Sequence, residues 1–394
     1  MRQHRIPATF MRGGTSKALV FHARDLPADR AAWPDLFRSA IGGNDPNGRQ
    51  LDGMGGGISS LSKVCVIAAS ARDDADIDYT FFQVSPTAEA VDDSSNCGNM
   101  SSAMAPFAVD EGVVQASGEQ AAIRIYNTNT QKIIVSRFAL DDGFAAVDGD
   151  FALPGVAGMG SPVKLDFLSP GGARTGKLLP TGNTVDTLTL ADGSTIQASM
   201  VDAANPCVFV RAADVGMIGT ELPMAMDNDT ALLAKLEAVR RAASVAMGIT
   251  ASLEAAAKMP AAPKVAYVGP PATTKTLDGK IMAASEVDLL ARMISVGAPH
   301  RAIPLTGALC TSVAAKIKGT LVHEVTRAGD AVRVGQPSGT TVVDADVQRQ
   351  AYGAWHAEAA SVFRTQRRLM DGYVYVSAAK NPMLAATPLT QAAE

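Results

Sequence analysis

The hydrophobic residues of this chain fall mostly into short runs that are broken by glycine-rich turns. In the first half, residues 7–22 indicate a strand, a turn at Gly13-Gly14 and a second strand, because short apolar runs bounded by glycine are typical of hairpins. The segment 48–57 (GRQLDGMGGG) holds too many glycines for regular structure, so we expect a loop. Further strands are predicted at 63–70, 78–84 and 121–140, and helices at 29–41 and 99–108.

The second half repeats this order of elements loosely. Residues 196–210 again indicate a strand, a break of small residues and an apolar strand. The segments 229–247 and 285–296 carry Leu, Ala, Val and Met at helical spacing, which predicts two amphipathic helices. Beyond them we predict a helix at 305–319, strands at 320–325, 331–335 and 340–343, a helix at 345–369 and a last strand at 373–376.

This repetition predicts two similar α+β domains that face each other across a cleft, where small-ligand sites are usually found. A chain of 394 residues is also longer than the roughly 250–300 residues at which a single core stops growing. The composition of 180–192 favours a linker there. We therefore expect domains at 1–188 and 189–394. The last strand can return to the first domain and pair with a strand there.

Composition narrows the class of partner. Hydrophobic residues make up 47% of the chain and charged residues 19%, as in a folded globular protein. Aromatic residues are scarce at 5% and the net charge is −4, so we expect no nucleic-acid partner. The N-terminus MRQHRIPATF lacks the apolar core of a signal peptide, and no stretch of about 18 apolar residues follows. We therefore expect a cytoplasmic protein with no membrane partner.

One of the four cysteines has the surroundings of a reactive thiol. Cys65, Cys97, Cys207 and Cys310 are widely spaced, and we expect free thiols in a reducing compartment. Cys97 is followed by Gly98 and Asn99, directly before a predicted helix. A thiol at a helix N-terminus feels the positive end of the helix dipole, which favours the thiolate. The free N–H groups of that turn can also bind a carboxylate. The alternative is a buried structural cysteine.

Lys63 follows the glycine-rich loop and lies where a strand begins. Val64 and Ile67 of that strand are expected to pack, so Lys63 can be partly buried, and burial favours the neutral amine that serves as a base. Taken alone, the local sequence favours a solvated lysine at a strand end instead.

The remaining candidate groups are suited to binding anions. Residues 12–17 (RGGTSK) offer two cations, two hydroxyl groups and flexible backbone, but they lack the full phosphate-loop pattern. His300 and Arg301 precede a predicted helix and could bind anions, although such a pair is more often surface charge. The five histidines show no paired metal-ligand spacing, so we expect no metal.

Eight short motifs together resemble one family, the PrpF or 2-methylaconitate cis-trans isomerase family. They are, in order, 11–17 (MRGGTSK), 51–56 (LDGMGG), 62–64 (SKV), 96–99 (NCGN), 179–183 (LPTGN), 205–206 (NP) with 208–210 (VFV), 299–301 (PHR) with 305–308 (LTGA), and 337–339 (PSG). Each motif alone is weak, but the resemblance spans about residues 7 to 378.

The resemblance implies a fold similar to diaminopimelate epimerase. That fold has two pseudo-symmetric domains, each a curved, mostly antiparallel sheet wrapped round a central helix. It also implies a cofactor-independent shift of a proton and a double bond in a small unsaturated polycarboxylate, with Lys63 and Cys97 as catalytic residues. With the local reasoning, it implies substrate contacts from Arg12, Thr15, Ser16, Lys17, Ser62, Gly98, Asn99, Asn205, His300, Arg301, Thr306, Gly307 and Ser338.

The chain departs from the family pattern around the expected pocket, at Ile58, Leu61, Asp93, Ser95 and Gln336. Epimerases of this fold use two thiols, one at the start of each central helix. Aligning Cys97 with the start of the second helix gives Pro304 or Leu305, and Cys310 lies a full turn further on. The sequence therefore disfavours a two-thiol racemase.

The substrate stays open between three related acids. The favoured reaction is isomerisation of 2-methylaconitate in propionate catabolism by the methylcitrate cycle. The alternatives are a 4-oxalomesaconate tautomerase and an aconitate isomerase. A non-enzymatic alternative is an accessory partner of an aconitase-type dehydratase. A homodimer is also compatible with the resemblance.

Overall fold

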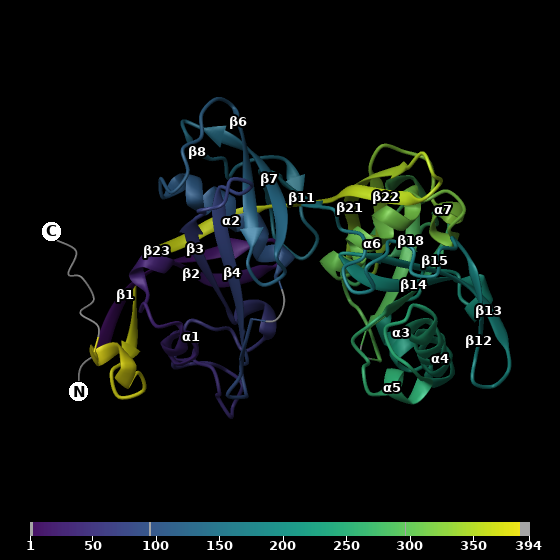
Figure 1. Cartoon of the computed structure of the whole chain (residues 1–394), viewed down its shortest axis with the longest axis horizontal. Coiled ribbons are helices and arrows are strands. Elements are labelled where there is room, and N and C mark those ends of the chain that lie inside the picture. Colours follow the sequence, from purple (N-terminus) through teal and green to yellow (C-terminus); the bar gives the residue numbers. More distant parts are fainter. Residues whose placement is uncertain (1–2, 94–95, 296, 387–394) are drawn as a thin grey trace. The chain divides into compact units, whose positions relative to one another are not determined.

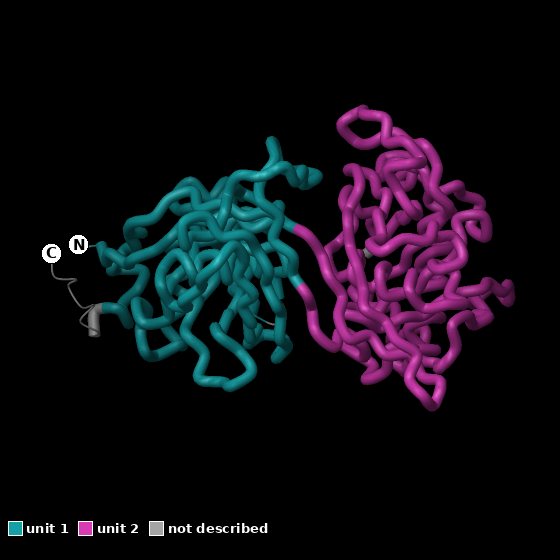
Figure 2. Tube along the Cα trace, turned by 90° about the horizontal axis from the view of Figure 1, so that it is seen from above, with its two compact units in different colours: residues 1–165, 364–394 teal, residues 166–363 magenta. Residues whose placement is uncertain are grey.

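The computed structural model describes residues 3–93, 96–295 and 297–386 (Figure 1). Contacts divide the chain into two compact units, residues 1–165 with 364–394 and residues 166–363 (Figure 2). The expected boundary at 188/189 falls inside the second unit, within β12 (Asp186–Thr189), because β12 pairs with β13 (Thr195–Ala203). The last strand, β23 (Gln366–Ser377), belongs to the first unit, where it pairs with β1 (Gln3–Gly13).

The first unit is a sheet with one helix buried against it. Its strands run in the order β23, β1, β2, β3, β4, β6 and β7, antiparallel except for the β2–β3 and β4–β6 pairs. Helix α2 (Gly98–Asp110) is buried at every residue from 100 to 109, so protein surrounds it on all sides. The other elements are α1 (Trp33–Ile41), β2 (Ser16–His22), β3 (Lys63–Ala69), β4 (Ile77–Val84), β5 (Val91–Asp92), β6 (Gln120–Asn127), β7 (Lys132–Asp141), β8 (Phe144–Ala145), β9 (Phe151–Ala152) and β10 (Met159–Gly160).

The second unit is built in the same way around α6 (Leu305–Lys316), which is buried from residue 307 to 315. Helix α4 (Thr230–Ala246) packs Leu236 and Val239 into a separate cluster with Val208 and Tyr267 of the sheet. The other elements are β11 (Val163–Leu168, shared with the first unit), β14 (Asn205–Arg211), α3 (Pro223–Asp227), α5 (Leu253–Ala257), β15 (Lys264–Gly269), β16 (Thr274–Lys275), β17 (Ile281–Met282), β18 (Leu289–Ser295), β19 (Ala298–Pro299), α7 (Leu321–Val325), β20 (Val332–Gln336), β21 (Gly339–Arg349) and β22 (Trp355–Arg364).

The two units share one topology. In the first, the β1–β2 hairpin is followed by β3 parallel to β2, β4 antiparallel to β3, helix α2, and β6 parallel to β4. In the second, the β13–β14 hairpin is followed by β15 parallel to β14, β18 antiparallel to β15, helix α6, and β20 parallel to β18. The predicted α+β fold, with a mostly antiparallel sheet round a central helix in each unit, is confirmed.

Three of the predicted elements are wrong. The helix at 285–296 is mainly strand β18, because the spacing of apolar residues in a short buried run does not separate strand from helix. The helix at 345–369 is replaced by strands β21 to β23, whose pairing overrides the helix propensity of the alanines. The strand at 320–325 is helix α7, which the Thr320 hydroxyl group caps by accepting from the His323 amide.

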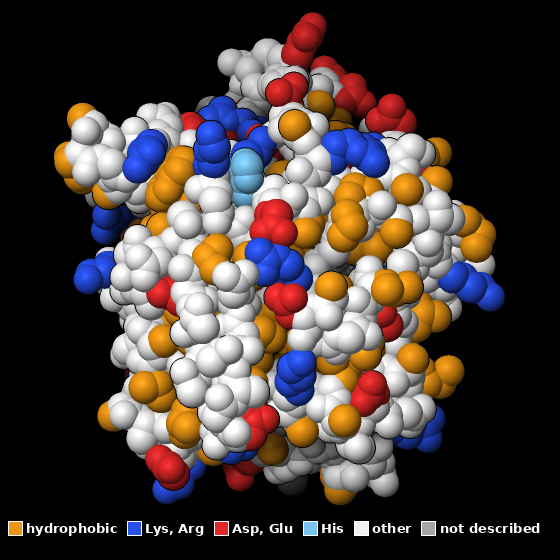
Figure 3. Space-filling view, turned by 90° about the vertical axis from the view of Figure 1, so that its right-hand side faces the viewer, with side chains coloured by type: hydrophobic (Ala, Val, Ile, Leu, Met, Phe, Trp, Pro, Cys, Tyr) orange, Lys and Arg blue, Asp and Glu red, His pale blue; other side chains and the backbone are white. Residues whose placement is uncertain are grey.

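The surface shows no segregation of one charge on the side drawn in Figure 3, where Lys and Arg side chains are interspersed with Asp and Glu. Hydrophobic side chains are scattered between them, as is normal for a folded protein. In the described part of the chain, no helix is both long and apolar enough to cross a membrane.

The turn between β1 and β2 packs directly on the first turn of α2, so we expect Gly13→Ala to be destabilising. A Cβ atom at position 13 would lie 2.7 Å from the carbonyl oxygen of Asn99 and 3.0 Å from the Cα atom of Met100. Such overpacking typically costs about 1–3 kcal/mol, which urea unfolding would measure. Gly329→Ala is the control, because its Cβ would approach nothing closer than 3.3 Å. Equal losses in both variants would contradict the close contact.

Candidate active site

Lys63 is the first residue of β3 and its side chain is buried, with 8% of the residue exposed. Its Nζ atom donates a hydrogen bond of 2.6 Å to Oε1 of Gln83, its partner on β4. The same atom lies 4.9 Å from the centre of the Phe81 ring. No carboxylate forms an ion pair with Lys63 among the residues that the structure describes. The lysine is thus held by a neutral acceptor and an aromatic face.

The orientation of Gln83 is fixed by its own amide nitrogen. Its Nε2 atom donates to the carbonyl oxygens of Ser59 (3.0 Å), Ser62 (2.9 Å) and Val84 (3.2 Å). The amide oxygen is therefore the end that faces Lys63. Because two of these carbonyls belong to the loop before β3, the glycine-rich loop and the lysine are positioned together.

Ser62 supports this loop. It is fully buried, and its hydroxyl group donates to Oε1 of Gln50 (2.6 Å) and the carbonyl oxygen of Ile58 (2.8 Å). The Gln50 oxygen also accepts from the Gly57 amide at 2.8 Å. In this structure the Ser62 hydroxyl group stabilises the loop, and its expected contact with substrate stays a prediction.

Cys97 is the N-cap residue of α2 and is half-buried. Its side chain makes no capping hydrogen bond, and the first helical bond runs from the Ser101 amide to the Cys97 carbonyl oxygen at 3.0 Å. The N–H groups of Gly98 and Asn99 belong to the first turn, where a helix has no acceptor of its own. The start of α2 therefore combines a partly exposed thiol with amide groups that favour an anion.

The other three cysteines are buried. Burial raises the pKa of Cys65 far above its usual value, and it does the same for Cys310. Cys310 donates to the Val201 carbonyl oxygen at 3.3 Å and lies within α6, whereas the N-cap of α6 is Pro304. No thiol occupies the start of α6, as the sequence predicted.

A buried arginine that the sequence did not indicate lies beside Cys97. The Nε atom of Arg364 donates to Oδ1 of Asn99 at 3.0 Å, and Nδ2 of Asn99 donates to the Thr15 hydroxyl group at 3.1 Å. Burial lowers the pKa of Arg364 to about 10, and the Cys97 thiol acts in the opposite direction. Arg364 thus fixes the side chain of Asn99 and adds positive charge near the thiol.

The polar side chains of residues 12–17 mainly hold the β1–β2 turn in place beside Asn99. Nη1 of Arg12 donates at 3.0 Å to the Gly14 carbonyl oxygen and to both the carbonyl and hydroxyl oxygens of Thr365. Burial, with Arg367 nearby, lowers the pKa of Arg12. Ser16 is buried, and the Lys17 ammonium group lies 5.4 Å from the Phe10 ring centre. The Arg12 guanidinium therefore holds the turn that seats Thr15 on Asn99.

The candidates from the second half form a second group within the second unit. The Ser338 hydroxyl group donates to the Arg301 carbonyl oxygen at 2.6 Å, and the His300 amide donates to the Met293 carbonyl oxygen at 2.8 Å. Burial lowers the pKa of His300 to about 4, with a further contribution from Lys264, so the imidazole is neutral at pH 7. Gly307 lies against Met293, with no room for a Cβ atom. Thr306 lies in the first turn of α6.

Two buried polar atoms of this group have no hydrogen-bond partner among the described residues. They are Nε2 of His300 and Nδ2 of Asn205. Unpaired buried polar atoms are uncommon, and a ligand can supply the missing partner.

A hollow of about 760 Å³ in the first unit has neither Lys63 nor Cys97 in its lining. It is lined by charges of both signs, and Lys380 pairs there with Asp52 at 3.0 Å while Arg38 pairs with Asp35. This balance gives the hollow little attraction for a polycarboxylate. Among the described side chains no three His, Cys, Asp or Glu residues gather as metal ligands would.

The family profile described as PrpF protein matches residues 3–377. The chain belongs to the PrpF family. It is 41% identical to a 3-methylitaconate isomerase of Eubacterium barkeri, over 96% of this chain and 99% of the relative. It is also 41% identical to a 2-methyl-aconitate isomerase of Cupriavidus necator, over 95% and 98%. Among solved structures, a methylitaconate-delta-isomerase with 40% identity superposes with a TM-score of 0.89, covering 100% of this chain and 99% of the other.

These relatives are named as isomerases, and the match to each covers nearly the whole of both chains. This PrpF-family chain is therefore an isomerase. The residues that the family pattern marked both lie in the first unit, Lys63 at the start of β3 and Cys97 at the start of α2. Their catalytic roles stay predictions. Arg364 was missed because nothing in its local sequence connects it with Asn99, 265 residues earlier.

The geometry around Lys63 predicts that Gln83→Leu lowers kcat by roughly 10- to 100-fold, because misplacement of a reacting group by about 1 Å has an effect of that size. The leucine keeps the volume of the side chain but removes the oxygen that receives Nζ. The assay follows turnover of an unsaturated polycarboxylate, with the melting temperature as a check on folding. Gln120→Leu, at an exposed position of β6, is the control. If both variants keep wild-type kcat, Gln83 does not position the lysine.

Proposed function

We propose that this protein is a cofactor-independent isomerase that moves a proton and a double bond in a small unsaturated polycarboxylate, with 2-methylaconitate as the preferred substrate. The supporting observation is that the first unit holds both a half-buried thiol at the uncapped start of α2 and a buried lysine at the start of β3. The 41% identity to a 2-methyl-aconitate isomerase supports this choice of substrate.

The reaction breaks one allylic C–H bond, shifts the double bond by one carbon, and forms a C–H bond at the far end of the allyl unit. Removing the proton is difficult because negative charge must spread onto the neighbouring carboxylate. The amide groups of Gly98 and Asn99 favour an anion at this place, and Arg364 adds positive charge. The redistribution of charge requires no electron acceptor, because the product is an isomer.

Lys63 and Cys97 divide the proton transfers between them in this proposal. Lys63 removes the allylic proton, and Cys97 returns one or polarises the intermediate. The reverse assignment uses the same residues. In a shift that stays on one face of the substrate, a single group removes and returns the proton.

The residues that depart from the family pattern bear on the choice of acid. Ile58 is exposed, whereas Leu61 fills the space over Gly56, where a Cβ atom would come within 2.6 Å of its Cδ1 atom. Gln336 is buried, and its Oε1 atom accepts from the Ser338 amide at 3.0 Å. Asp93 is exposed, and Ser95 lies outside the described residues.

Because the chain is equally similar to a 3-methylitaconate isomerase, methylitaconate is the second candidate substrate.

The wider setting follows from this choice of acid. We place the enzyme in propionate catabolism by the methylcitrate cycle, in the cytoplasm, with no metal, nucleic-acid or membrane partner and with a homodimer as one compatible assembly. The alternative is an accessory protein of an aconitase-type dehydratase, in which these residues have no catalytic role.

Incubation of the purified protein in D2O tests the proposal. The acids are 2-methylaconitate, methylitaconate, 4-oxalomesaconate and cis-aconitate, with a chiral amino diacid as the control for racemisation. We expect isomerisation of 2-methylaconitate, with deuterium at the allylic position, in the presence of a chelator. The amino diacid should keep its configuration, since Pro304 stands where a second thiol would be needed.

The outcomes separate the alternatives. Conversion of another acid in place of 2-methylaconitate would change the substrate and keep the reaction. Failure with every unsaturated acid, followed by activity only after addition of the dehydratase, would establish the accessory role. Loss of turnover on chelation that a divalent ion restores would contradict a metal-free reaction.

A further inference from the structure

The turn between β6 and β7 completes one edge of strand β4. The opposite edge of β4 pairs with β3. On the edge in question, β6 pairs with β4 up to Tyr79 and β5 pairs with it from Gln83 onward, so Phe81 lies between two partner strands. Asn129, in the turn, fills this gap with its side chain. Its Oδ1 atom accepts from the Phe81 amide at 2.8 Å, and its Nδ2 atom donates to the Phe81 carbonyl oxygen at 2.9 Å.

The same amide group holds the segment that leads to Cys97. The Nδ2 atom of Asn129 also donates to the carbonyl oxygen of Asp93 at 2.7 Å, and Asp93 directly follows β5. The Oδ1 atom of Asn129 accepts a second hydrogen bond, from Nδ2 of Asn127, at 3.1 Å. Both hydrogens and both lone pairs of this amide are therefore used. A reversed amide would turn its oxygen towards two carbonyl oxygens, so the hydrogen bonds fix its orientation.

Asn127, the last residue of β6, contacts the other end of this segment. It is fully buried, and its Nδ2 atom donates at 3.4 Å to Oδ1 of Asn96, the residue before Cys97. The Ser101 hydroxyl group donates to the same Asn96 oxygen at 3.3 Å and to the Cys97 carbonyl oxygen at 3.2 Å. Side chains thus hold the chain both at Asp93 and directly before the thiol.

Asn129 also binds the strand that lies against Lys63. The centre of the Phe81 ring is 4.9 Å from Nζ of Lys63. Gln83, two residues further along β4, accepts the hydrogen bond of the lysine. One side chain therefore binds the backbone of a residue in contact with the lysine and the backbone that leads to the thiol.

We propose that Asn129 is a positioning residue, which holds the segment before Cys97 against the strand that surrounds Lys63. Lys63 and Cys97 lie on separate elements, β3 and α2, so their geometry depends on contacts between those elements. Misplacement of a reacting group by about 1 Å can cost roughly 100-fold in rate. The effect on turnover rests on the proposed function, whereas the anchoring of the segment does not.

Hydrogen–deuterium exchange of the Ser101 amide tests the anchoring without any substrate, because this amide makes the first helical hydrogen bond to Cys97. In Asn129→Ala we expect its exchange to be roughly tenfold faster, the effect of losing one or two hydrogen bonds that resist local opening. Asn129→Asp is the second variant, because it keeps an oxygen for the Phe81 amide and removes the donor to Asp93. It should also speed the exchange.

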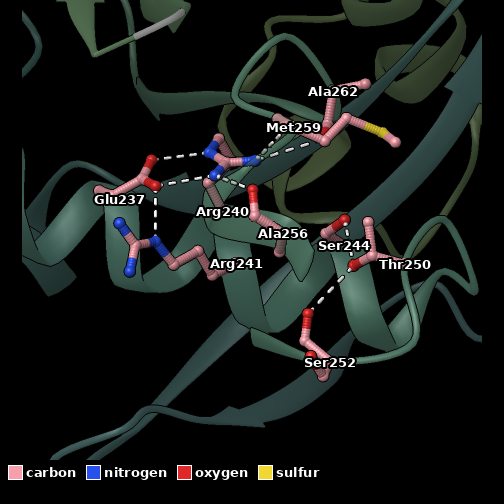
Figure 4. A network of polar contacts seen from close by, with 9 residues as sticks. All are labelled: Glu237, Arg240, Arg241, Ser244, Thr250, Ser252, Ala256, Met259 and Ala262. Atoms are coloured by element: carbon pink, nitrogen blue, oxygen red, sulfur yellow. Dashed lines mark hydrogen bonds and ion pairs between the residues drawn. The ribbon is translucent and has the colours of Figure 1, made fainter. Parts of the chain in front are cut away.

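Two variants away from the site serve as controls. Asn381→Ala makes the same change in the first unit, where Asn381 is 2% exposed and its Nδ2 atom donates to the Ser377 carbonyl oxygen at 2.9 Å. Ser244→Ala removes a hydroxyl group from the polar network of the second unit, where it shares a hydrogen bond of 2.9 Å with Thr250 (Figure 4). No residue drawn in that network is a candidate for the site. Both controls should lower the melting temperature and leave the exchange of Ser101 unchanged.

Turnover provides the second readout. Both Asn129 variants should lower kcat roughly 10- to 100-fold and leave KM within about threefold, because the geometry of the reacting groups is changed and binding is kept. The controls should keep kcat within about threefold.

The two readouts must change together. Wild-type exchange of Ser101 or wild-type kcat in both Asn129 variants would overturn the proposal, and so would unfolding of both, since the role would then be structural. If the wild type isomerises no acid while the exchange responds as expected, the anchoring by Asn129 stands and the proposed function fails.

Discussion

The first turn of α2 has amide groups that the helix itself cannot satisfy, and much of the first unit is arranged around them. Protein surrounds α2 from residue 100 to 109, yet its N-cap side chain makes no capping bond. The β1–β2 turn lies so close to this point that only glycine fits at position 13. Arg12 holds that turn, and Arg364 holds Asn99 beside it. The packing leaves an electropositive helix start with a thiol at its edge.

The central helix of the second unit also begins without a capping side chain, but no cysteine lies at its start. Helix α6 is equally enclosed and also lacks a capping side chain, but its N-cap is Pro304 instead of a cysteine. The strand equivalent to β3 keeps its lysine at the first position, as Lys264. The duplicated scaffold thus provides two helix starts without a capping side chain, of which the first alone has a partly exposed thiol. This asymmetry suits a one-thiol proton shift better than a two-thiol racemisation.

Local signals in the sequence were enough to predict the elements next to the site. The start of α2 was visible because a small polar segment, Asn96 to Asn99, precedes a run of small apolar residues. Lys63 was less visible, since a lysine at a strand end is usually solvated, and its burial depends on Gln83 across the sheet. Strand β18 was mistaken for a helix because, in a short buried run, apolar residues at helical spacing also fit a strand that is buried on both faces.

Long-range placement was the part that local patterns could not supply. Arg364 and Lys264 have no motif around them. The hydrogen bond from Arg364 to Asn99 and the pairing of Lys264 with Cys207 become visible only in the folded chain. The domain boundary was misjudged for the same reason. Strand β12 resembles a linker in composition, but its pairing with β13 places it within the second unit.

The central claim is that Lys63 and Cys97 move the proton, and the most direct measurement is the kcat of Lys63→Met and Cys97→Ala on the acid that the wild type isomerises. The account predicts that each variant folds with a near wild-type melting temperature and loses roughly 10²- to 10⁴-fold in kcat, the usual contribution of a general acid or base. Near wild-type kcat in either variant would remove that residue from the mechanism. Near wild-type kcat in both would contradict the account.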